Sequence, residues 1–248
     1  MNVFEGGRGK VDAICAWLKS LEPDVVCIQE ANGWSDNDFA TCKRVAEQTG
    51  LQFYQYGRSY TRYDTAIFSR QKPLGSGELN YRLTHSITWV ELPFGDGTVK
   101  ICNWHADPRS EDFRLFELRD IKKSLDMSGS VVWCGDFNSL LPADVTPELE
   151  KNLLAAGVEK FGIDHVRSDV MTEVEAWGFT DVAELLNAAV PTQDLGVNDP
   201  QYGSPVPIRI DHVMIKGIAR EQVADFQTVD NTRFSDHRPL VLKLSERE

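Results

Sequence analysis

Apolar residues recur along the chain in two spacings, one typical of helices and one of strands. Val11, Ile14, Cys15 and Leu18 follow one another at steps of three and four, which predicts a helix over residues 9–21. Short continuous apolar runs predict buried strands. Further helices are predicted over 36–50 and 110–125, and helical segments with loops over 147–157 and 168–187. The predicted strands cover 24–30, 51–56, 65–68, 86–93, 98–104, 130–136, 208–215 and 240–244. Both an α/β and a β-rich fold are compatible with this mixture.

Two other stretches bear on the site. Residues 191–207 are rich in proline, glycine and asparagine, a composition typical of loops that carry substrate contacts. This stretch leads into a strand that contains Asp211, so we expect it to border the site, with Tyr202 as a substrate-binding residue. Residues 1–4 resemble the end of a strand, and the first strand is therefore expected to be truncated at its amino end.

Length and composition favour one folded unit. The chain has 248 residues, of which 42% are hydrophobic, so we expect a single domain over 1–248 with a large core. Five cysteines without a CxxC pair indicate a reducing compartment. The apolar runs are far shorter than the roughly 18 residues that a membrane span needs. The resulting expectation is a cytoplasmic monomer without a membrane span.

The net charge of −12 restricts the partners that the protein can bind. Proteins that bind nucleic acid mainly by neutralising its phosphates usually carry a basic surface. The balance therefore weighs against a high-affinity, nonspecific DNA binder. It leaves room for a local basic patch and for carboxylates that bind metal ions.

Polar residues recur where the apolar strands end, and this placement points to a site. A carboxylate beside a buried strand is costly unless it is paired or bound to a metal. Hard divalent ions prefer carboxylate oxygens, so the set predicts a Mg²⁺ or Mn²⁺ site. The residues at strand ends are Asn2, Glu30, His105, Asp136, Asn138, Asp236 and His237, and Asp211 lies within a strand.

The two histidines of this set can act on a phosphate. His237 is predicted to stabilise negative charge on the phosphoryl oxygens. Asp211 is its expected orienting partner, because Asp236 is its chain neighbour and adjacent residues on a strand point apart. His105 is predicted to lie nearer the leaving group as an acid, with Asp64 as its orienting carboxylate.

In their order along the chain, these motifs resemble the endonuclease/exonuclease/phosphatase superfamily. Its members include pancreatic deoxyribonucleases, exonuclease III-type abasic endonucleases, tyrosyl-DNA phosphodiesterases, neutral sphingomyelinases and inositol-polyphosphate 5-phosphatases. The resemblance implies an α/β fold, a four-layer α/β/β/α sandwich with two mostly antiparallel central sheets and the site at one edge. The matching segments are Asn2-Val3, Val25-Val26-Cys27-Ile28-Gln29-Glu30, Asn103-Trp104-His105, Gly135-Asp136-Phe137-Asn138, Arg209-Ile210-Asp211-His212 and Ser235-Asp236-His237.

The resemblance also implies roles at the metal and the water. Glu30 and Asp236 match metal-site acids of the family, and Asn2 matches an asparagine close to the metal and the phosphate. Asp136 matches the acid that positions or deprotonates the attacking water. Asn138 matches its neighbour that contacts the phosphate. Mg²⁺ or Mn²⁺ is the implied cofactor.

The remaining matches concern the substrate. His237 matches the histidine that contacts the scissile phosphate, Asp211 the acid that orients it, and His105 a second histidine found in many members. Asn103, in the same segment as His105, is assigned to substrate binding. The implied activity is hydrolysis of a phosphate ester, first as a phosphodiesterase or nuclease with DNA as a candidate substrate. A small-molecule or lipid-headgroup phosphatase is the second reading, and a non-catalytic binding module is the third.

Overall fold

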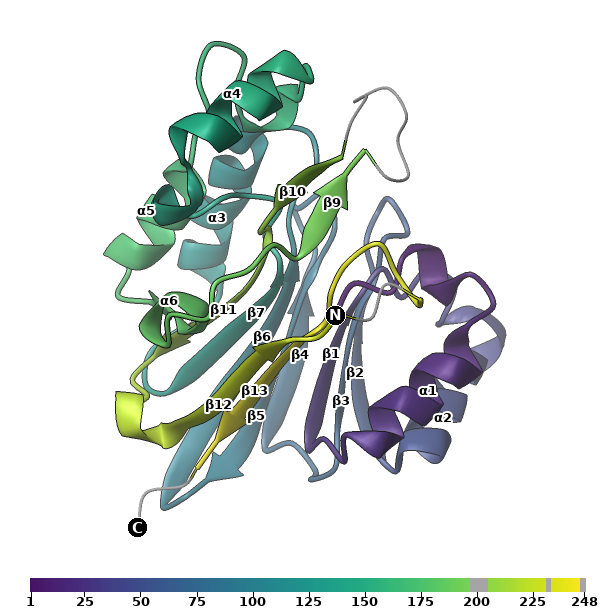
Figure 1. Ribbon diagram of the computed structural model, residues 1–248. Coiled ribbons are helices and arrows are strands. Elements are labelled where there is room, and N and C mark those ends of the chain that lie inside the picture. Colours follow the sequence, from purple (N-terminus) through teal and green to yellow (C-terminus); the bar gives the residue numbers. More distant parts are fainter. Residues whose placement is uncertain (197–204, 231–232, 246–248) are drawn as a thin grey trace.

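The computed structural model describes residues 1–196, 205–230 and 233–245, and its centre consists of two layers of strands (Figure 1). The larger sheet has the strand order β4-β5-β6-β7-β11-β8. Apolar side chains make its inner strands β7 and β11 nearly continuous buried runs, as the sequence pattern predicts. The strands are β4 (Gly75–Leu79), β5 (Ile87–Phe94), β6 (Gly97–His105), β7 (Val131–Asp136), β11 (Asp211–Lys216) and β8 (Thr180–Asp181).

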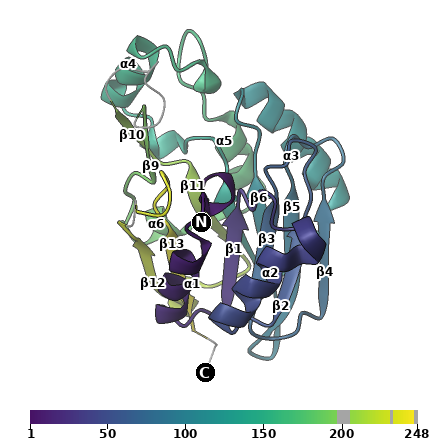
Figure 2. The same ribbon diagram turned by 90° about the vertical axis from the view of Figure 1, so that its right-hand side faces the viewer.

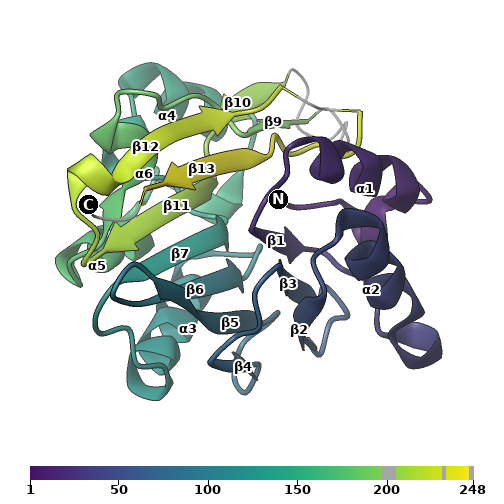
Figure 3. The same ribbon diagram turned by 90° about the horizontal axis from the view of Figure 1, so that it is seen from below.

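A second layer of strands faces the larger sheet (Figure 3). It contains β1 (Val25–Gln29), β3 (Thr65–Ser69) and β2 (Phe53–Gly57) in that spatial order, and the pair β12 (Val223–Thr228) and β13 (Leu240–Leu244). The apolar cluster between the layers includes Ile67, Val132 and Phe226. The strand pairs are antiparallel apart from β6 and β7, which run parallel.

Helices cover the outer side of each layer (Figures 1 and 2). On the larger sheet, α3 (Glu111–Ser124) and α5 (Asp169–Ala176) bury Leu118 and Val174 against Trp133. On the smaller sheet, α1 (Val11–Ser20) and α2 (Asp36–Thr49) bury Ile14 and Val45 against Phe68. The protein is therefore the four-layer α/β/β/α sandwich that was predicted. The shorter helices are η1 (Glu5–Gly7), η2 (Pro142–Asp144), α4 (Pro147–Ala155), η3 (Glu159–Phe161), α6 (Val182–Leu185) and η5 (Arg220–Gln222).

Two segments in the second half of the chain contain short strands that were not predicted. The helical segments predicted over 168–187 are α5 and α6, and the short strand β8 lies between them where a loop was predicted. Gly178 lies between α5 and β8 with a φ of 91°, a conformation that ends the helix. The predicted loop over 191–207 also contains two strands, β9 (Gln193–Leu195) and β10 (Val206–Ile208), which pair antiparallel.

Strand register brings the predicted site residues to one edge of the sheets. His105 at the end of β6 pairs with Asp136 at the end of β7, and Asp136 also pairs with Asp211 at the start of β11. From the other layer, Asn2 forms a parallel bridge with Gln29, the residue before Glu30.

A glycine is required beside Asp136. Gly135 has a φ of 145°, and a Cβ at this position would lie 1.9 Å from the carbonyl oxygen of Trp104. Only a residue without a side chain permits this approach of β7 to β6.

Among the described residues, no helix is long and apolar enough to cross a membrane.

Candidate active site

The centre of the site is a pair of buried carboxylates joined by an amide. The Asn2 side chain donates from Nδ2 to Glu30 Oε1 at 2.9 Å and to Asp136 Oδ2 at 3.3 Å. The backbone N–H of Phe4 donates to Asn2 Oδ1 at 2.9 Å, which fixes the orientation of this amide. The backbone N–H of Glu5 donates to the other oxygen of Glu30, Oε2, at 2.6 Å. The amino end of the chain thus links an acid from each β layer.

The Glu30 carboxyl has an unfavourable electrostatic environment. Burial raises its pKa, and the charge of Asp136 raises it further, although hydrogen bonds from Glu5 and Asn2 act in the opposite direction. Two neighbouring buried acids are costly unless a positive charge lies near them. Their carboxylate oxygens, with Asn2 beside them, are the donors that a hard divalent ion prefers. These residues therefore fit a divalent cation.

Asn138 follows the strand end and is fixed by three contacts. Its backbone N–H donates to Asp136 Oδ1 at 2.9 Å, and its φ of 50° turns the chain back toward that acid. Its side-chain Nδ2 donates to the carbonyl of Ala106 at 3.2 Å. Its Oδ1 accepts from Lys160 Nζ at 3.1 Å. Asn138 therefore connects Asp136, the candidate for positioning the water, to the ammonium group of Lys160.

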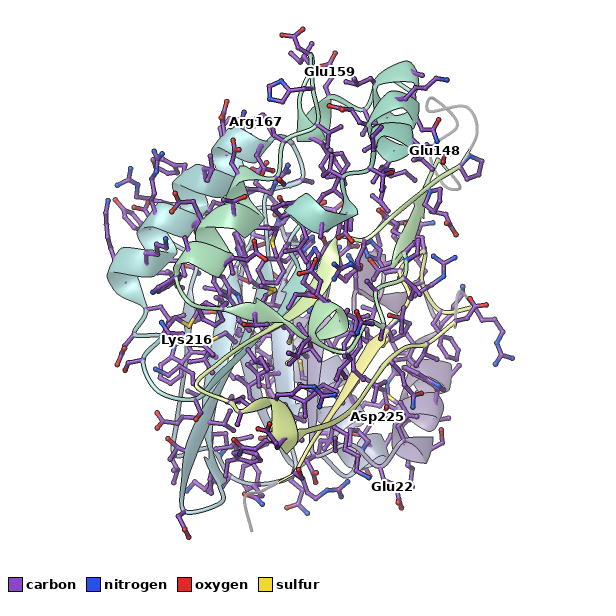
Figure 4. All side chains as sticks on the ribbon, turned by 60° about the vertical axis from the view of Figure 1, so that its left-hand side comes forward. Glu22, Glu148, Glu159, Arg167, Lys216 and Asp225 are labelled. Atoms are coloured by element: carbon purple, nitrogen blue, oxygen red, sulfur yellow. The ribbon has the colours of Figure 1, made fainter. Side chains whose placement is uncertain are left out.

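Lys160 is a site residue that sequence reasoning missed. It lies in η3, 22 residues from Asn138 along the chain, and its neighbour Glu159 is exposed at the upper end of the molecule in Figure 4. Burial lowers the pKa of Lys160 to about 8, while the charges of Asp136, Asp211 and Asp236 act to raise it. No motif marks this lysine in the sequence.

His237 and Asp211 form the predicted pair. His237 Nδ1 lies 2.7 Å from Asp211 Oδ2, and His237 Nε2 lies 3.8 Å from Asp136 Oδ2. Burial alone would lower the pKa of His237, but the charge of Asp211 and its hydrogen bond, together with Asp136 and Asp236, raise it to about 10. The imidazole is therefore charged at neutral pH and donates from both nitrogens.

Gln193, at the start of β9, borders His237 and was also missed. Its side-chain nitrogen is placed 2.9 Å from His237 Nε2, while its Oε1 has no hydrogen-bond partner in the described part of the chain. Because a charged imidazole is a donor at Nε2, the amide must be turned so that Oε1 accepts from it. The described part of the 191–207 stretch thus contacts the site. Tyr202 lies outside the described residues.

His105 is at the site, but its predicted environment is wrong. Its Nε2 lies 3.7 Å from Asp136 Oδ2, and its Nδ1 has no hydrogen-bond partner within residues 1–196, 205–230 and 233–245. Asp64, the expected orienting acid, instead accepts from Tyr56 Oη at 2.6 Å and from the backbone of Ser59 at 2.7 Å. His85 stacks on His105 with ring centroids 4.1 Å apart.

The charge state of His105 does not suit a proton donor. Burial lowers its pKa to about 3, and the positive charges of His237 and Lys160 act in the same direction. A side chain that is neutral at pH 7 cannot supply a proton as an imidazolium acid. The predicted role of His105 as the acid is therefore not supported, and a neutral hydrogen-bond donor is the role that this environment allows.

The other two assignments have different outcomes. Asn103 is fully buried, its Nδ2 donates to the carbonyls of Ile28 and Ala66, and its Oδ1 accepts from Gln29. It ties the two β layers together, so the predicted role in substrate binding is wrong. Asp236 is partly exposed, and its charge acts on both His237 and Lys160, which places it beside the centre.

The site contains several groups that can hold a cation. One ligand atom from each of Asp136, Asp211 and His237 lies within 4.8 Å of the others. However, Asp211 and His237 are bonded to each other, so the oxygen-rich side formed by Glu30 and Asp136 is the better place for a hard ion.

A sandwich of two sheets with acids, an asparagine and a charged histidine at one edge defines the chain as a hydrolase of the phosphoesterase class. The sequence agrees: residues 2–237 match the Endonuclease/Exonuclease/phosphatase family, and the chain belongs to that family. A search of curated proteins finds no match to the sequence.

Solved structures with the same fold cover nearly the whole chain. An AP endonuclease from Archaeoglobus fulgidus superposes with a TM-score of 0.70 at 18% identity, over 98% of this chain and 97% of that one. A family protein from Leptotrichia buccalis C-1013-b gives 0.66 at 14% identity, over 97% and 94%. A humanized D. rerio TDP2 carrying 14 mutations gives 0.63 at 18% identity, over 98% and 95%. At these identities the likeness establishes the fold.

Proposed function

We propose that the protein is a Mg²⁺- or Mn²⁺-dependent phosphodiesterase that hydrolyses its substrate with a water molecule. The observation that carries this proposal is the convergence of Asn2, Glu30, Asp136, Asp211 and His237 on one buried centre. These residues come from chain segments up to 235 positions apart, and a purely structural role does not require buried acids to face one another.

Each group at the centre has a distinct proposed task. Asp136 accepts the proton of the attacking water, since Asn2 and the Asn138 backbone N–H hold its two oxygens in place. Asn138 contacts the phosphate. His237, charged through Asp211, stabilises the negative charge that develops on a phosphoryl oxygen, and its Nε2–H donates there when the substrate displaces the Gln193 amide. A divalent ion held beside Asp136 by Glu30, Asp236 and Asn2 would neutralise charge on the phosphate.

An aromatic and basic surface beside His105 supports a nucleic-acid substrate. Tyr60 and Tyr81 are 77% and 69% exposed, and Arg58 and Arg62 are also exposed. The segments 58–64 and 80–86 that carry them are joined by hydrogen bonds, and Tyr63 contacts the His105 ring edge-on at 6.3 Å. Aromatic faces stack on bases and arginines contact phosphates.

The first test measures the chemistry alone. Wild-type protein should cleave bis-(p-nitrophenyl) phosphate with Mg²⁺ or Mn²⁺ and lose this activity in excess chelator. Asp136→Asn should lower kcat by at least about 10²-fold. Asp96→Asn, an exposed acid in the turn between β5 and β6, serves as the matched control. Full turnover in chelator would exclude the metal-dependent reaction, and no turnover under any metal would favour the non-catalytic binding module.

A second test addresses the substrate. A panel of abasic DNA, single-stranded DNA, 5′-tyrosyl DNA, sphingomyelin and inositol phosphates should be cleaved with preference for DNA. The double variant Tyr60→Ala/Tyr81→Ala should raise KM for single-stranded DNA about 5- to 150-fold, because stacking on one base contributes roughly 1–3 kcal/mol. Its rate on bis-(p-nitrophenyl) phosphate should be unchanged, as should both activities of the control Leu74→Ala. A preference for lipid or inositol phosphates would favour the headgroup phosphatase instead.

A further inference from the structure

We propose that Lys160 is a positioning residue of the site, which holds the side-chain amide of Asn138 in the one orientation that presents N–H to the phosphate. This inference rests on the proposed function, since it concerns the same reaction. The observation behind it is the contact from Lys160 Nζ to Asn138 Oδ1 at 3.1 Å.

The two partners of the Asn138 amide leave one orientation. An ammonium group only donates hydrogen bonds, so Lys160 requires the oxygen of the amide on its side. The carbonyl of Ala106 only accepts, so it requires the nitrogen, Nδ2, at 3.2 Å. Turning the amide by half a turn would place N–H against ammonium and oxygen against carbonyl. Nδ2 has two hydrogens, and the second is available for a phosphoryl oxygen.

Without Lys160, only one of the two contacts that select the orientation of the Asn138 amide would remain. Ala106 would still favour one orientation through a neutral hydrogen bond, which is weaker than one to a charged group. An amide that presents its oxygen would repel the phosphate. Asn138 also holds Asp136 through its backbone, and that bond does not depend on Lys160. Loss of Lys160 should therefore act on the orientation of the Asn138 side chain, while Lys160→Arg keeps the positive charge that Lys160 places near Asp136 and His105.

A buried ion pair fixes the distance between Lys160 and Asn138. The carbonyl of Lys160 accepts from Arg114 Nη2 at 2.6 Å, and Arg114 is fully buried in a bond to Glu111 at 2.8 Å. Glu111 in turn accepts from the hydroxyl of Ser139, the residue after Asn138, at 2.9 Å. Both segments are thus anchored to the same pair in α3. This pre-organisation is what a positioning contact requires.

Two other roles for Lys160 make different predictions. If Lys160 contacted the phosphate directly, its loss would lower the rate whether or not the Asn138 amide were present. If Lys160 only supported the fold, its loss would lower the melting temperature and reduce the rate on every substrate through unfolding. A double-mutant cycle with Asn138→Ala separates these cases, because residues that act through one another are not additive.

The experiment measures kcat and KM on bis-(p-nitrophenyl) phosphate with Mn²⁺, and thermal stability, for each variant. Lys160→Met should lower kcat about 10- to 100-fold, the range expected for a hydrogen bond to a charged group, with KM changed less than about 3-fold. Lys160→Arg, which keeps a donor-only cation, should recover most of the loss. In the Asn138→Ala background, Lys160→Met should lower kcat by less than about 3-fold. Lys151→Met removes the same charge from an exposed position in α4 and should match wild type.

Several outcomes would overturn the proposal. Additive losses in the cycle would make Lys160 an independent phosphate ligand, and an unchanged kcat in folded Lys160→Met would remove any role. The side-chain amide resonances of Asn138 give a readout that needs no activity: Lys160→Met should shift them, and Lys151→Met should not. If wild-type protein were inactive, the proposed function would fail while these resonances still tested the contact. Unshifted resonances would exclude it.

Discussion

The His237–Asp211 pair makes the stability of the metal-free protein depend on pH in a way that one substitution should reverse. The pKa of His237 in the folded protein is about 10, against 6.5 for an ordinary histidine. A group whose pKa is raised by folding adds stability at pH values below its unfolded pKa. That contribution is then lost as the pH rises from 6.5 through 10.

The size of the effect follows from the same two values. Each pKa unit corresponds to about 1.4 kcal/mol, so the protonation of His237 in its folded environment contributes on the order of 5 kcal/mol to the free energy of unfolding below pH 6.5. Asp211→Asn preserves the shape of the side chain but removes its charge. Burial, which lowers the pKa of His237, is then opposed only by Asp136 and Asp236, whose effects are smaller than that of Asp211. We therefore expect the histidine of this variant to be neutral in the folded state at neutral pH.

Urea unfolding of chelator-treated protein between pH 6 and pH 10 provides the measurement. The stability difference between wild type and Asp211→Asn should shrink steadily as the pH rises, because only the wild type loses the imidazolium contribution. Asp96→Asn should follow the wild-type curve, since both retain the pair. Parallel curves for wild type and Asp211→Asn over this range would refute the charge state assigned to His237.

Three further expectations concern the neighbours of this centre. Burial lowers the pKa of His85 to about 2, so protonation of this histidine in the unfolded chain should destabilise the wild-type protein as the pH falls. In urea unfolding, wild type should lose about 2 kcal/mol more stability between pH 7 and pH 5 than His85→Phe does. An equal loss in the two proteins would contradict this. His105→Ala should lower kcat equally on p-nitrophenyl and alkyl leaving groups, since a neutral ring is no acid; a larger loss on alkyl esters would restore that role. Arg114→Met should cost about 3–5 kcal/mol in urea unfolding by leaving Glu111 unpaired, whereas a cost under about 1 kcal/mol would show that the pair is not needed.

The fold could be predicted where strands are apolar throughout. β1 and β7 are continuous apolar runs, and their predicted bounds differ from the observed ones by one residue at each end or less. β4 was missed because its sequence, Gly-Ser-Gly-Glu-Leu, lies at the sheet edge and buries little. β12 was missed because its burial is intermittent, with Val223 and Phe226 inside. Pairing with neighbouring strands makes these segments strands, and pairing is not visible in a local pattern.

The site could be predicted where its residues stand at the ends of such strands. Glu30 and Asp136 were found from that placement and Asp211 from its position within a predicted apolar strand, and the register shows that these positions meet. Lys160 and Gln193 were not found, because nothing around them in the sequence is periodic or motif-like. They reach the centre through the folding of η3 and β9 onto it. Contacts of this kind depend on tertiary packing and leave no trace in neighbouring residues.

Charge state is the property that the sequence predicted least well, and the two histidines explain why. His105 Nε2 and His237 Nε2 lie 3.7 and 3.8 Å from the same oxygen of Asp136. Their pKa values nevertheless move in opposite directions, to about 3 and about 10. Burial acts on both, but only His237 has a carboxylate on its second nitrogen, whereas His105 has the ring of His85 against its face. The shared acid therefore cannot determine which histidine is charged; the residue on the far side of each ring does, and this makes His237 the charged one of the two.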